Sequence, residues 1–262
     1  MAEKPLSYGE YLQLDELLSL QRVDPVGDHD EMLFILIHQA SELWFKELLH
    51  ELRLAQDSLE ADRASMALGT LKRILAVLKT LVGQMDILET MTPVAFSAFR
   101  HRLDPASGFQ SAQFREIEFV LGLKRPERAK QFAIGSEERR RIEELGSRPS
   151  LWISFLRYLR IRGHEIPDEV LDRDLGLSTE ESPAVQEVLM EIYRSDILAT
   201  QLCESLVDLD EGVQEWRYRH LKIAERTIGA KLGTGGSAGA EYLRQTLFKP
   251  LFPDLWAIRS SL

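Results

Sequence analysis

The chain has 262 residues, of which 44% are hydrophobic and 28% charged, so it can fold as one large or two small globular domains. Its formal charge of −10 argues against nucleic acid as a partner, because nucleic-acid-binding proteins need a basic surface. The single cysteine, Cys203, allows no intramolecular disulfide. No apolar stretch has the length of a membrane span, and the first residues lack the pattern of a secretory signal peptide. We therefore expect a cytoplasmic protein with no membrane partner.

Helical periodicity runs through almost the whole chain. Asp28 and Glu31 have the spacing of a capping box and predict a helix that continues to about residue 60. Thr92 before Pro93 predicts another helix start, because threonine caps helices and proline fits the first helical position. The other predicted helices span 68–90, 111–123, 151–162 and a long region 183–229, with one more starting at Ser136 and Gly212 marking where the last could bend.

The same pattern predicts the fold class and the domain organisation. Alternating, β-branched strand patterns are missing, so the chain is predicted to be all-α. Neither a repeat nor a clean linker divides it, so residues 1–262 are predicted to form one domain. Residues 124–148 are charged and poor in apolar side chains, and Pro167 interrupts the helical pattern further on. We therefore expect residues 124–185 to form a smaller and less compact helical excursion.

His38 lies among almost exclusively apolar neighbours on the predicted 29–60 helix. Phe34, Ser41 and Phe45 share its helical face. The adjacent stripe is predicted to pack in the core and consists of Leu33, Ile37, Trp44 and Leu48. One interpretation of His38 is a core histidine bonded to a neighbouring group. The other is a polar group inside an apolar pocket, which is how sites for small molecules are built.

His220 lies near the end of a predicted helix, and the glycine-rich residues 233–239 that follow cannot be helical. Trp216, Ile223 and Thr227 share the face of His220. Its basic neighbours are Arg217, Arg219 and Lys222, so one interpretation is an exposed histidine in a basic turn. The other is a ligand of a metal or cofactor. The glycine segment lacks the lysine and the preceding strand of a nucleotide-binding loop, and is predicted to be a mobile flap.

Arg100 has Phe96, Phe99 and Leu103 as close neighbours in sequence. It could be an ordinary surface arginine. Alternatively, its stem packs against these apolar side chains and its guanidinium binds a carboxylate, for which the planar fork of donors is well suited.

Three segments together resemble one protein family. They are the stretch from His29 to Lys46, the pair Phe99 and Arg100 followed by Pro105 to Ser111, and the glycine segment from Gly233 to Ser237. They closely resemble tryptophan 2,3-dioxygenases of the bacterial type, with a likeness that extends from Tyr8 to Leu262 and is weakest around 124–185. That family is haem-dependent, cytosolic and all-helical. The resemblance thus implies a helical bundle that encloses haem b, iron protoporphyrin IX.

The resemblance also implies roles for individual residues. His220 corresponds to the proximal ligand of the haem iron, with basic neighbours that could neutralise the haem propionates. His38 corresponds to the distal histidine that faces the indole nitrogen, Arg100 to the arginine that binds the substrate carboxylate, and Thr234 to a threonine that bonds the amino-acid end. The other matched pocket positions are Phe34, Phe96, Leu103 and Ser107. Some relatives carry tyrosine at the Phe96 position, so a hydroxyl contact to the carboxylate is lost here.

Two tyrosines near the N-terminus match residues that a neighbouring subunit contributes to the site in that family. They are Tyr8 and Tyr11, on a short amphipathic segment. The resemblance therefore implies that residues 1–20 pack on a neighbour in a homo-oligomer, expected to be a tetramer built as a dimer of dimers.

The function expected from this resemblance is insertion of both atoms of O2 across the indole C2–C3 bond of L-tryptophan, which gives N-formyl-L-kynurenine. His38 is expected to orient the indole rather than to act as an obligatory base, because an indole N–H is a very weak acid. Two alternatives stay open: a related haem enzyme acting on a modified indole, and a non-catalytic haem-based sensor.

Overall fold

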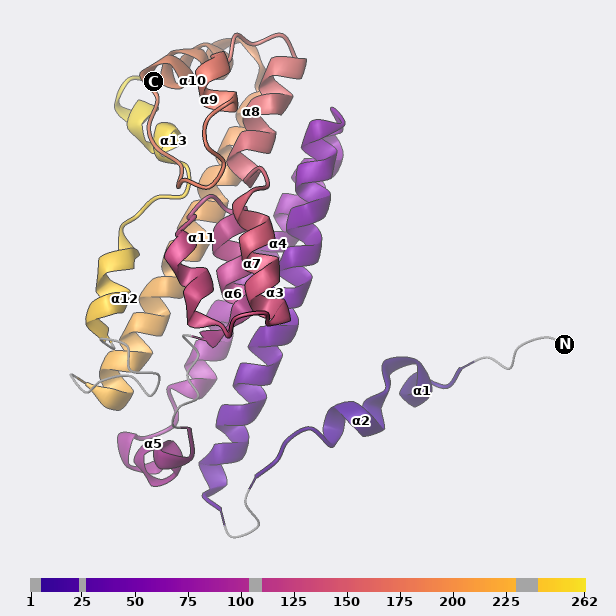
Figure 1. Ribbon diagram of the computed structural model, residues 1–262, viewed down its shortest axis with the longest axis vertical. Helices are drawn as coiled ribbons and strands as arrows, with labels where there is room; N and C mark the ends of the chain where they lie inside the picture. The colour runs from indigo at the N-terminus through magenta and orange to yellow at the C-terminus, as the bar shows by residue number, and fades with distance from the viewer. Residues whose placement is uncertain (1–5, 24–26, 104–109, 230–239) are drawn as a thin grey trace, which may run out of the picture.

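A computed structural model describes residues 6–23, 27–103, 110–229 and 240–262. Within these ranges every regular element is a helix and no strand occurs, which confirms the predicted all-α class (Figure 1). The α-helices are α1 (Tyr8–Leu12), α2 (Leu14–Leu18), α3 (His29–Glu60), α4 (Ala64–Leu88), α5 (Pro93–Phe99), α6 (Ala112–Val120), α7 (Glu137–Gly146), α8 (Leu151–Ile161), α9 (Asp168–Leu171), α10 (Pro183–Ser195), α11 (Ile197–Ile228), α12 (Ala240–Leu247) and α13 (Pro253–Ala257). Shorter 3-10 turns are η1 (Arg100–Leu103), η3 (Pro126–Gln131) and η4 (Ile258–Ser260). In the described ranges, no helix combines the length and the apolar character needed to cross a membrane.

Three long helices, α3, α4 and α11, form the centre of the molecule, and α4 packs against both of the others (Figure 1). Apolar residues recur along α4 at helical spacing, and Leu71, Ile74 and Leu81 are each only 1% exposed. Burying one such side chain stabilises the fold by roughly 1.5–3 kcal/mol. The hydrophobic stripe that predicted this helix therefore also fixes which face meets α3 and α11.

Most predicted helix starts are confirmed by a capping hydrogen bond. The Thr92 hydroxyl accepts from the backbone N–H of Ala95 at 3.1 Å, and Ser136 caps α7 in the same way. The capping box predicted for Asp28 is wrong, because the Asp28 side chain makes no capping bond in α3. Arg102 of η1 instead donates to Glu31 at 2.5 Å and to Asp28 at 3.4 Å. The Arg102 guanidinium, from a distant segment, therefore binds both carboxylates in place of the backbone N–H groups at the start of α3.

The long helical region predicted for 183–229 is two helices, so that prediction is wrong in its continuity. Asp196 adopts an extended backbone conformation between α10 and α11, and its carboxylate accepts from the N–H of Ala199 at 3.0 Å. Gly212, by contrast, lies within the unbroken α11. A Cβ atom at that position would lie 3.3 Å from Cδ1 of Leu78, so glycine permits a close approach of α11 to α4.

Residues 124–185 pack in two different ways. Ile142 of α7 belongs to a small cluster with Phe119 and Ala129. Helix α8 contributes Trp152 and Phe155 to the main hydrophobic core, where both are almost fully buried. Figure 1 shows α8, α9, α10 and α13 gathered at one end of the long axis, with α5 at the other.

The N-terminal segment with α1 and α2 extends away from the body of the molecule (Figure 1). A pair of amide hydrogen bonds joins the end of this segment to the body: Gln21 donates to Gln39 at 2.6 Å, and Gln39 donates to the carbonyl of Leu20 at 3.3 Å. Large apolar side chains on this segment face solvent, and Tyr8 and Tyr11 are 76% and 74% exposed. We call residues 6–23 the N-terminal arm.

Candidate active site

A cavity of about 260 Å³ opens between α3, α4, α5, α6, α11 and α12. Both singled-out histidines, His38 and His220, face it. The described residues that line it are Phe34, Ile37, His38, Ser41, Glu42, Phe45, Met85, Leu88, Met91, Phe96, Ser111, Phe114, Arg115, Glu118, Trp216, Arg217, His220, Ile223, Ala224, Thr227, Ile228, Leu243 and Thr246. The predicted faces of both helices are confirmed, because Phe34, Ser41 and Phe45 line the cavity with His38, and Trp216, Ile223 and Thr227 line it with His220. Trp44, predicted as core, is 36% exposed instead.

His38 is held in one orientation by its own helix. Its Nδ1 atom lies 2.7 Å from the carbonyl oxygen of Phe34, and its ring packs against the Phe34 ring at 4.0 Å between centroids. A carbonyl can only accept, so Nδ1 carries the proton and Nε2 keeps its lone pair. Burial lowers the pKa of His38, an effect partly offset by the Phe34 carbonyl and by Glu42. A neutral imidazole with a free acceptor atom therefore faces the cavity.

His220 is the more enclosed histidine. Burial, and then the neighbouring His38 and Arg115, lower its pKa to about 4. His220 is partly exposed and lines the cavity, so its side chain is accessible to a ligand there. Neutral imidazole is the form that binds metal, so His220 is suited to hold a metal-containing cofactor. Cys203, the only possible thiolate ligand, is in the core, and burial raises the pKa of its thiol far above the usual value.

Phenylalanine side chains form the wall of the cavity at the α3 and α5 end. The Phe34 ring lies 5.8 Å from Phe96 and 5.5 Å from Phe99. Arg100 and Leu103 begin and end η1, directly after α5. Arg100 is half-buried, and Leu103 packs on the cluster that contains Phe96 and Phe99. Among the described residues, neither Arg100 nor Leu103 lines the cavity itself, so the structure brings Phe34, His38, Phe96 and His220 together and leaves these two beside them.

Four predicted residues are not among those that the structure places at the cavity. Ser107 and Thr234 are outside the described residues. Tyr8 and Tyr11 are on the N-terminal arm and do not line the cavity of their own chain.

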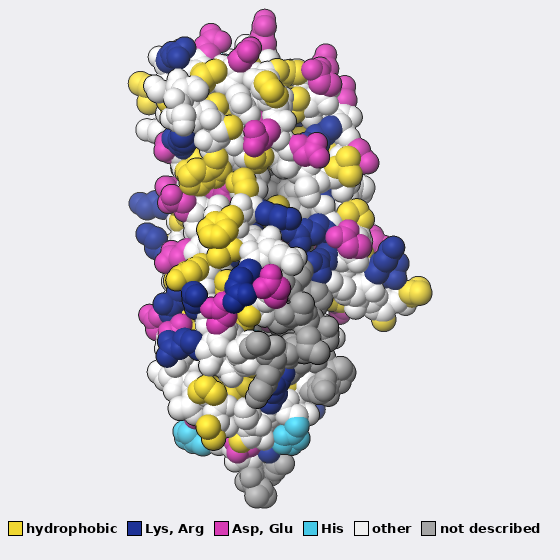
Figure 2. Space-filling view, turned by 90° about the vertical axis from the view of Figure 1, so that its left-hand side faces the viewer, with side chains coloured by type: hydrophobic (Ala, Val, Ile, Leu, Met, Phe, Trp, Pro, Cys, Tyr) yellow, Lys and Arg dark blue, Asp and Glu magenta, His cyan; other side chains and the backbone are white. Residues whose placement is uncertain are grey.

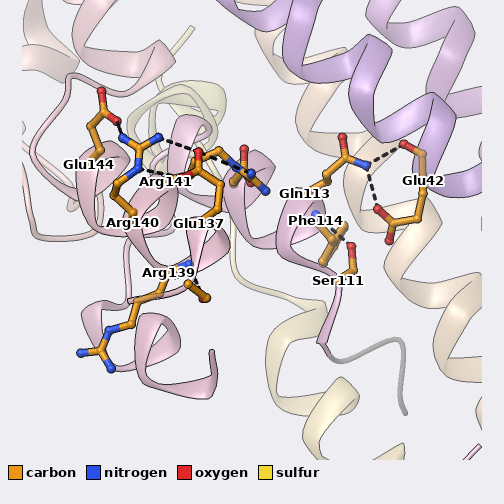
Figure 3. Close-up of polar contacts among 11 residues, drawn as sticks. Glu42, Ser111, Gln113, Phe114, Glu137, Arg139, Arg140, Arg141 and Glu144 are labelled. Carbon is orange, nitrogen blue, oxygen red and sulfur yellow. Dashed lines mark hydrogen bonds and ion pairs between the residues drawn. The ribbon is translucent and has the colours of Figure 1, made fainter. Parts of the chain in front are cut away.

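Several polar contacts in or beside the cavity were not predicted from the sequence. The Gln113 amide donates to the Glu42 backbone carbonyl at 2.9 Å and to its carboxylate at 2.8 Å, which ties α6 to α3 (Figure 3). Arg115 and Glu118 of α6 form a buried ion pair. The i,i+3 spacing of Arg115 and Glu118 is typical of an ion pair on one helix and could be recognised in the sequence. No local pattern indicated that Arg217 of α11 would also bind Glu118.

The basic neighbours of His220 differ in where they point. Arg217 lines the cavity. Arg219 pairs with Asp86 and Glu89, and Lys222 with Glu225, so both bind carboxylates of the protein. On the face in Figure 2, basic and acidic side chains are likewise interspersed. Of the three basic residues that the sequence places beside His220, Arg217 is the one that lines the cavity, although it too binds a carboxylate of the protein, that of Glu118.

Comparison with known proteins identifies the family. A family model described as tryptophan 2,3-dioxygenase matches residues 1–142 and 183–262. A protein named tryptophan 2,3-dioxygenase from Herpetosiphon aurantiacus is 56% identical over 98% of this chain and 98% of its own length. The chain belongs to the tryptophan 2,3-dioxygenase family. Proteins of that name from Anaeromyxobacter sp. strain K and Bacillus thuringiensis subsp. konkukian are 54% and 43% identical, over 98% of this chain in both cases and over 96% and 93% of their own lengths. The resemblance predicted from three long, ordered motifs is thereby confirmed.

The haem on which tryptophan 2,3-dioxygenases depend fits the residues of this cavity. His220 is neutral and enclosed, as an iron ligand must be, and most of the wall is apolar. Trp216, one helical turn before it, also lines the cavity, and its buried Nε1 has no hydrogen-bond partner among the described residues. A buried donor without a partner is costly, and a ligand with acceptor atoms would satisfy it.

Proposed function

We propose that this chain is a haem-dependent dioxygenase that opens the indole ring of L-tryptophan between C2 and C3 with both atoms of O2 and gives N-formyl-L-kynurenine. The observation that carries the proposal is the pair of neutral histidines, His38 on α3 and His220 on α11, that face one largely apolar cavity. One histidine can bind iron while the other stays available to the substrate. Membership of the tryptophan 2,3-dioxygenase family supports the substrate and the reaction.

His220 would hold the iron of haem b from the α11 side, and the haem would supply the activation of oxygen. On the α3 side, Nε2 of His38 accepts the indole N–H, because its Nδ1 proton is already bonded to the Phe34 carbonyl. This contact orients C2 and C3. It removes no proton, since the indole N–H is far too weak an acid to give one to a histidine with a lowered pKa.

The amino-acid part of the substrate would lie toward η1. There Arg100 binds the carboxylate, and Phe34, Phe96 and Leu103 pack against the indole. The resemblance to the family also assigns substrate contacts to Ser107 and Thr234, which are outside the described residues. Arg102 supports the arrangement, because its bonds to Glu31 and Asp28 fasten η1 to the first turn of α3. Arg100 is half-buried, so a carboxylate bound to it would be partly shielded from water, which strengthens the attraction between the two charges.

The N-terminal arm would complete the site of a neighbouring subunit. Its tyrosines, Tyr8 and Tyr11, are highly exposed, and an isolated chain leaves the apolar side of the arm in water. We therefore propose a homotetramer, built as a dimer of dimers, in which this surface is covered. A cytoplasmic location fits the single, buried and unpaired Cys203.

The direct test is to incubate the haem-loaded, reduced protein with L-tryptophan and 18O2. Formation of a product that absorbs as N-formylkynurenine and carries two labelled oxygen atoms supports the proposal. A product with one labelled atom would indicate a single-oxygen insertion, and a red protein without turnover would indicate a sensor. A protein that takes up no haem would refute the haem-dependent reading.

A further inference from the structure

Asp210 of α11 is a buried carboxylate whose hydrogen bonds reach the C-terminal segment. Its exposed fraction is 0%. Oδ2 accepts from the backbone N–H groups of Leu251 and Phe252 at 2.8 and 3.2 Å and from Nε1 of Trp256 at 2.9 Å. Oδ1 accepts from the side-chain amide of Gln214, on the same helix, at 2.9 Å. One side chain of α11 therefore holds a segment that begins 41 positions further along the chain.

The segment that Asp210 holds continues directly from α12, which forms part of the cavity wall. Helix α12 lies beside α11 (Figure 1), and its Leu243 and Thr246 line the same cavity as His220. The connection from the end of α12 to Leu251 is short, and it ends with Pro250, whose φ angle is fixed by its ring. A fixed Leu251 therefore restricts where α12 can lie.

The other contacts between α12 and α11 fix the position of α12 less strictly. Apolar side chains of α12 pack on Leu221, but hydrophobic contact has no preferred direction and permits sliding. Arg244 pairs with Glu225, but the arginine is 54% exposed, and exposed ion pairs contribute little. Arg217 donates to the carbonyl of Thr246 at 3.5 Å, which is longer than a typical hydrogen bond. Bonds to a buried carboxylate are shorter and stronger, so they set the position of α12 along α11.

Asp210 and His220 lie on one continuous helix, α11. The α12 wall is thus attached to the same helix that carries the proposed iron ligand. We propose that Asp210 is a positioning residue that fixes the α12 wall relative to His220 and thereby slows the release of haem from the cavity. This inference rests on the proposed function. Leu243 and Thr246 enclose the cavity that His220 faces, so a wall that moves away gives a group held by His220 a way out.

The first measurement is amide hydrogen exchange of the haem-free protein, which tests the position of α12 without any bound group. Asp210→Ala removes all four bonds and is expected to speed exchange throughout α12, as well as at Leu251 and Phe252, by on the order of tenfold. Faster exchange at Leu251 and Phe252 alone would show a purely local role and would overturn the inference, as would no change.

The second measurement is the rate at which haem passes from the loaded protein to an excess of apomyoglobin. Asp210→Ala should speed this release by on the order of tenfold. Asp210→Asn should stay near the parent rate, because its amide oxygen can take the place of Oδ2 and Gln214 can turn its own oxygen toward the new NH2 group. Both variants remove the negative charge, so the difference between them isolates the hydrogen bonds. Equal release from both would overturn the inference.

Asp254 provides a matched control in the same segment. It is 1% exposed and accepts from the N–H of Ser182 at 2.7 Å and from the amide of Gln186 at 3.0 Å, so it ties the segment to α10 instead of α11. Asp254→Ala should lower the denaturant midpoint and leave haem release at the parent rate. Release as fast as that of Asp210→Ala would indicate general destabilisation and would overturn the inference.

Trp256→Phe decides the question if Asp210→Ala does not fold. It removes one of the three donors to Oδ2 and leaves the carboxylate in place. Exchange in α12 and haem release should both rise by about threefold, the value of one ordinary hydrogen bond. Parent rates in this variant would overturn the inference. A parent protein that binds no haem would instead refute the proposed function, and with it the effect on release.

Discussion

The Nδ1 atom of His38 lies 2.7 Å from the carbonyl oxygen of Phe34, one turn earlier in α3. Because the partner is a backbone atom of the same helix, substrate cannot displace it without disturbing the helix. The tautomer of His38 is therefore set before any substrate binds, and the atom presented to the cavity is an acceptor.

Replacing His38 with alanine should lower kcat/KM for L-tryptophan by about three- to tenfold, the value of one lost hydrogen bond of ordinary strength. The haem spectrum should persist, because His38 is not the ligand. N1-methyl-L-tryptophan, which has no indole N–H, serves as the control and should lose little further in the variant. An equal fractional loss for both substrates would show that His38 acts in another way.

The acid limb of the pH profile should report the neutral form of His38. Burial lowers its pKa below the ordinary value of 6.5, so the accepting form survives below that pH. As pH falls through the lowered pKa, Nε2 gains a proton and kcat/KM should drop. Activity that already declines near pH 6.5 would contradict this assignment, as would an identical acid limb in His38→Ala.

Replacement of His220 by alanine should abolish stable haem binding, because no other described histidine besides His38 faces the cavity. The measurement is haem content and the absorption spectrum after reconstitution, compared with His38→Ala as the matched variant. Imidazole added to the His220→Ala protein should recover part of the spectrum. Normal haem retention without an added ligand would reassign the proximal position.

Arg100→Ala should reduce kcat/KM for L-tryptophan by tens-fold or more, because breaking a desolvated charge pair costs about 2–5 kcal/mol and about 1.4 kcal/mol is tenfold. The haem spectrum should hardly change. Tryptamine lacks the carboxylate, so it should be a poor substrate for the parent and lose little further in the variant. Should both substrates lose the same fraction, Arg100 would act through folding and the carboxylate role would have to be dropped.

Deletion of residues 1–15 should impair activity more than it impairs folding, because α1 and α2 contribute no residue to the hydrophobic core clusters. Circular dichroism measures folding, and size-exclusion chromatography measures assembly. Mixing the truncated protein with Arg100→Ala should restore part of the activity, provided that subunits exchange. A truncated monomer with full activity would rule out a shared site.

The sequence predicted those parts of the fold and site that depend on local spacing. Thr92 identified the start of α5, and helical periodicity placed Ser41 and Thr227 on the correct faces. The resemblance to a family supplied the pairing of His38 with His220, which no local pattern contains.

Contacts between distant segments were not predictable in this way. The Asp28 side chain does not cap α3 as expected but binds Arg102, which lies 74 positions away in sequence. Arg217 found its carboxylate partner, Glu118, across 99 positions. The break at Asp196 was missed because the helical spacing of apolar residues continues on both sides of it. The only local sign of the break is the Asp196 side chain, which caps the start of α11.

The missing side chain at Gly212 has a consequence for the iron ligand. Helix α11 is continuous from Ile197 to Ile228, so a shift at one point of the helix is passed on along it. His220 lies two turns after the glycine. A bulky side chain at position 212 would have to displace Leu78 or push α11 away from α4. The position of His220 in the cavity thus depends on the contact between Gly212 and Leu78, two residues that take no part in the reaction.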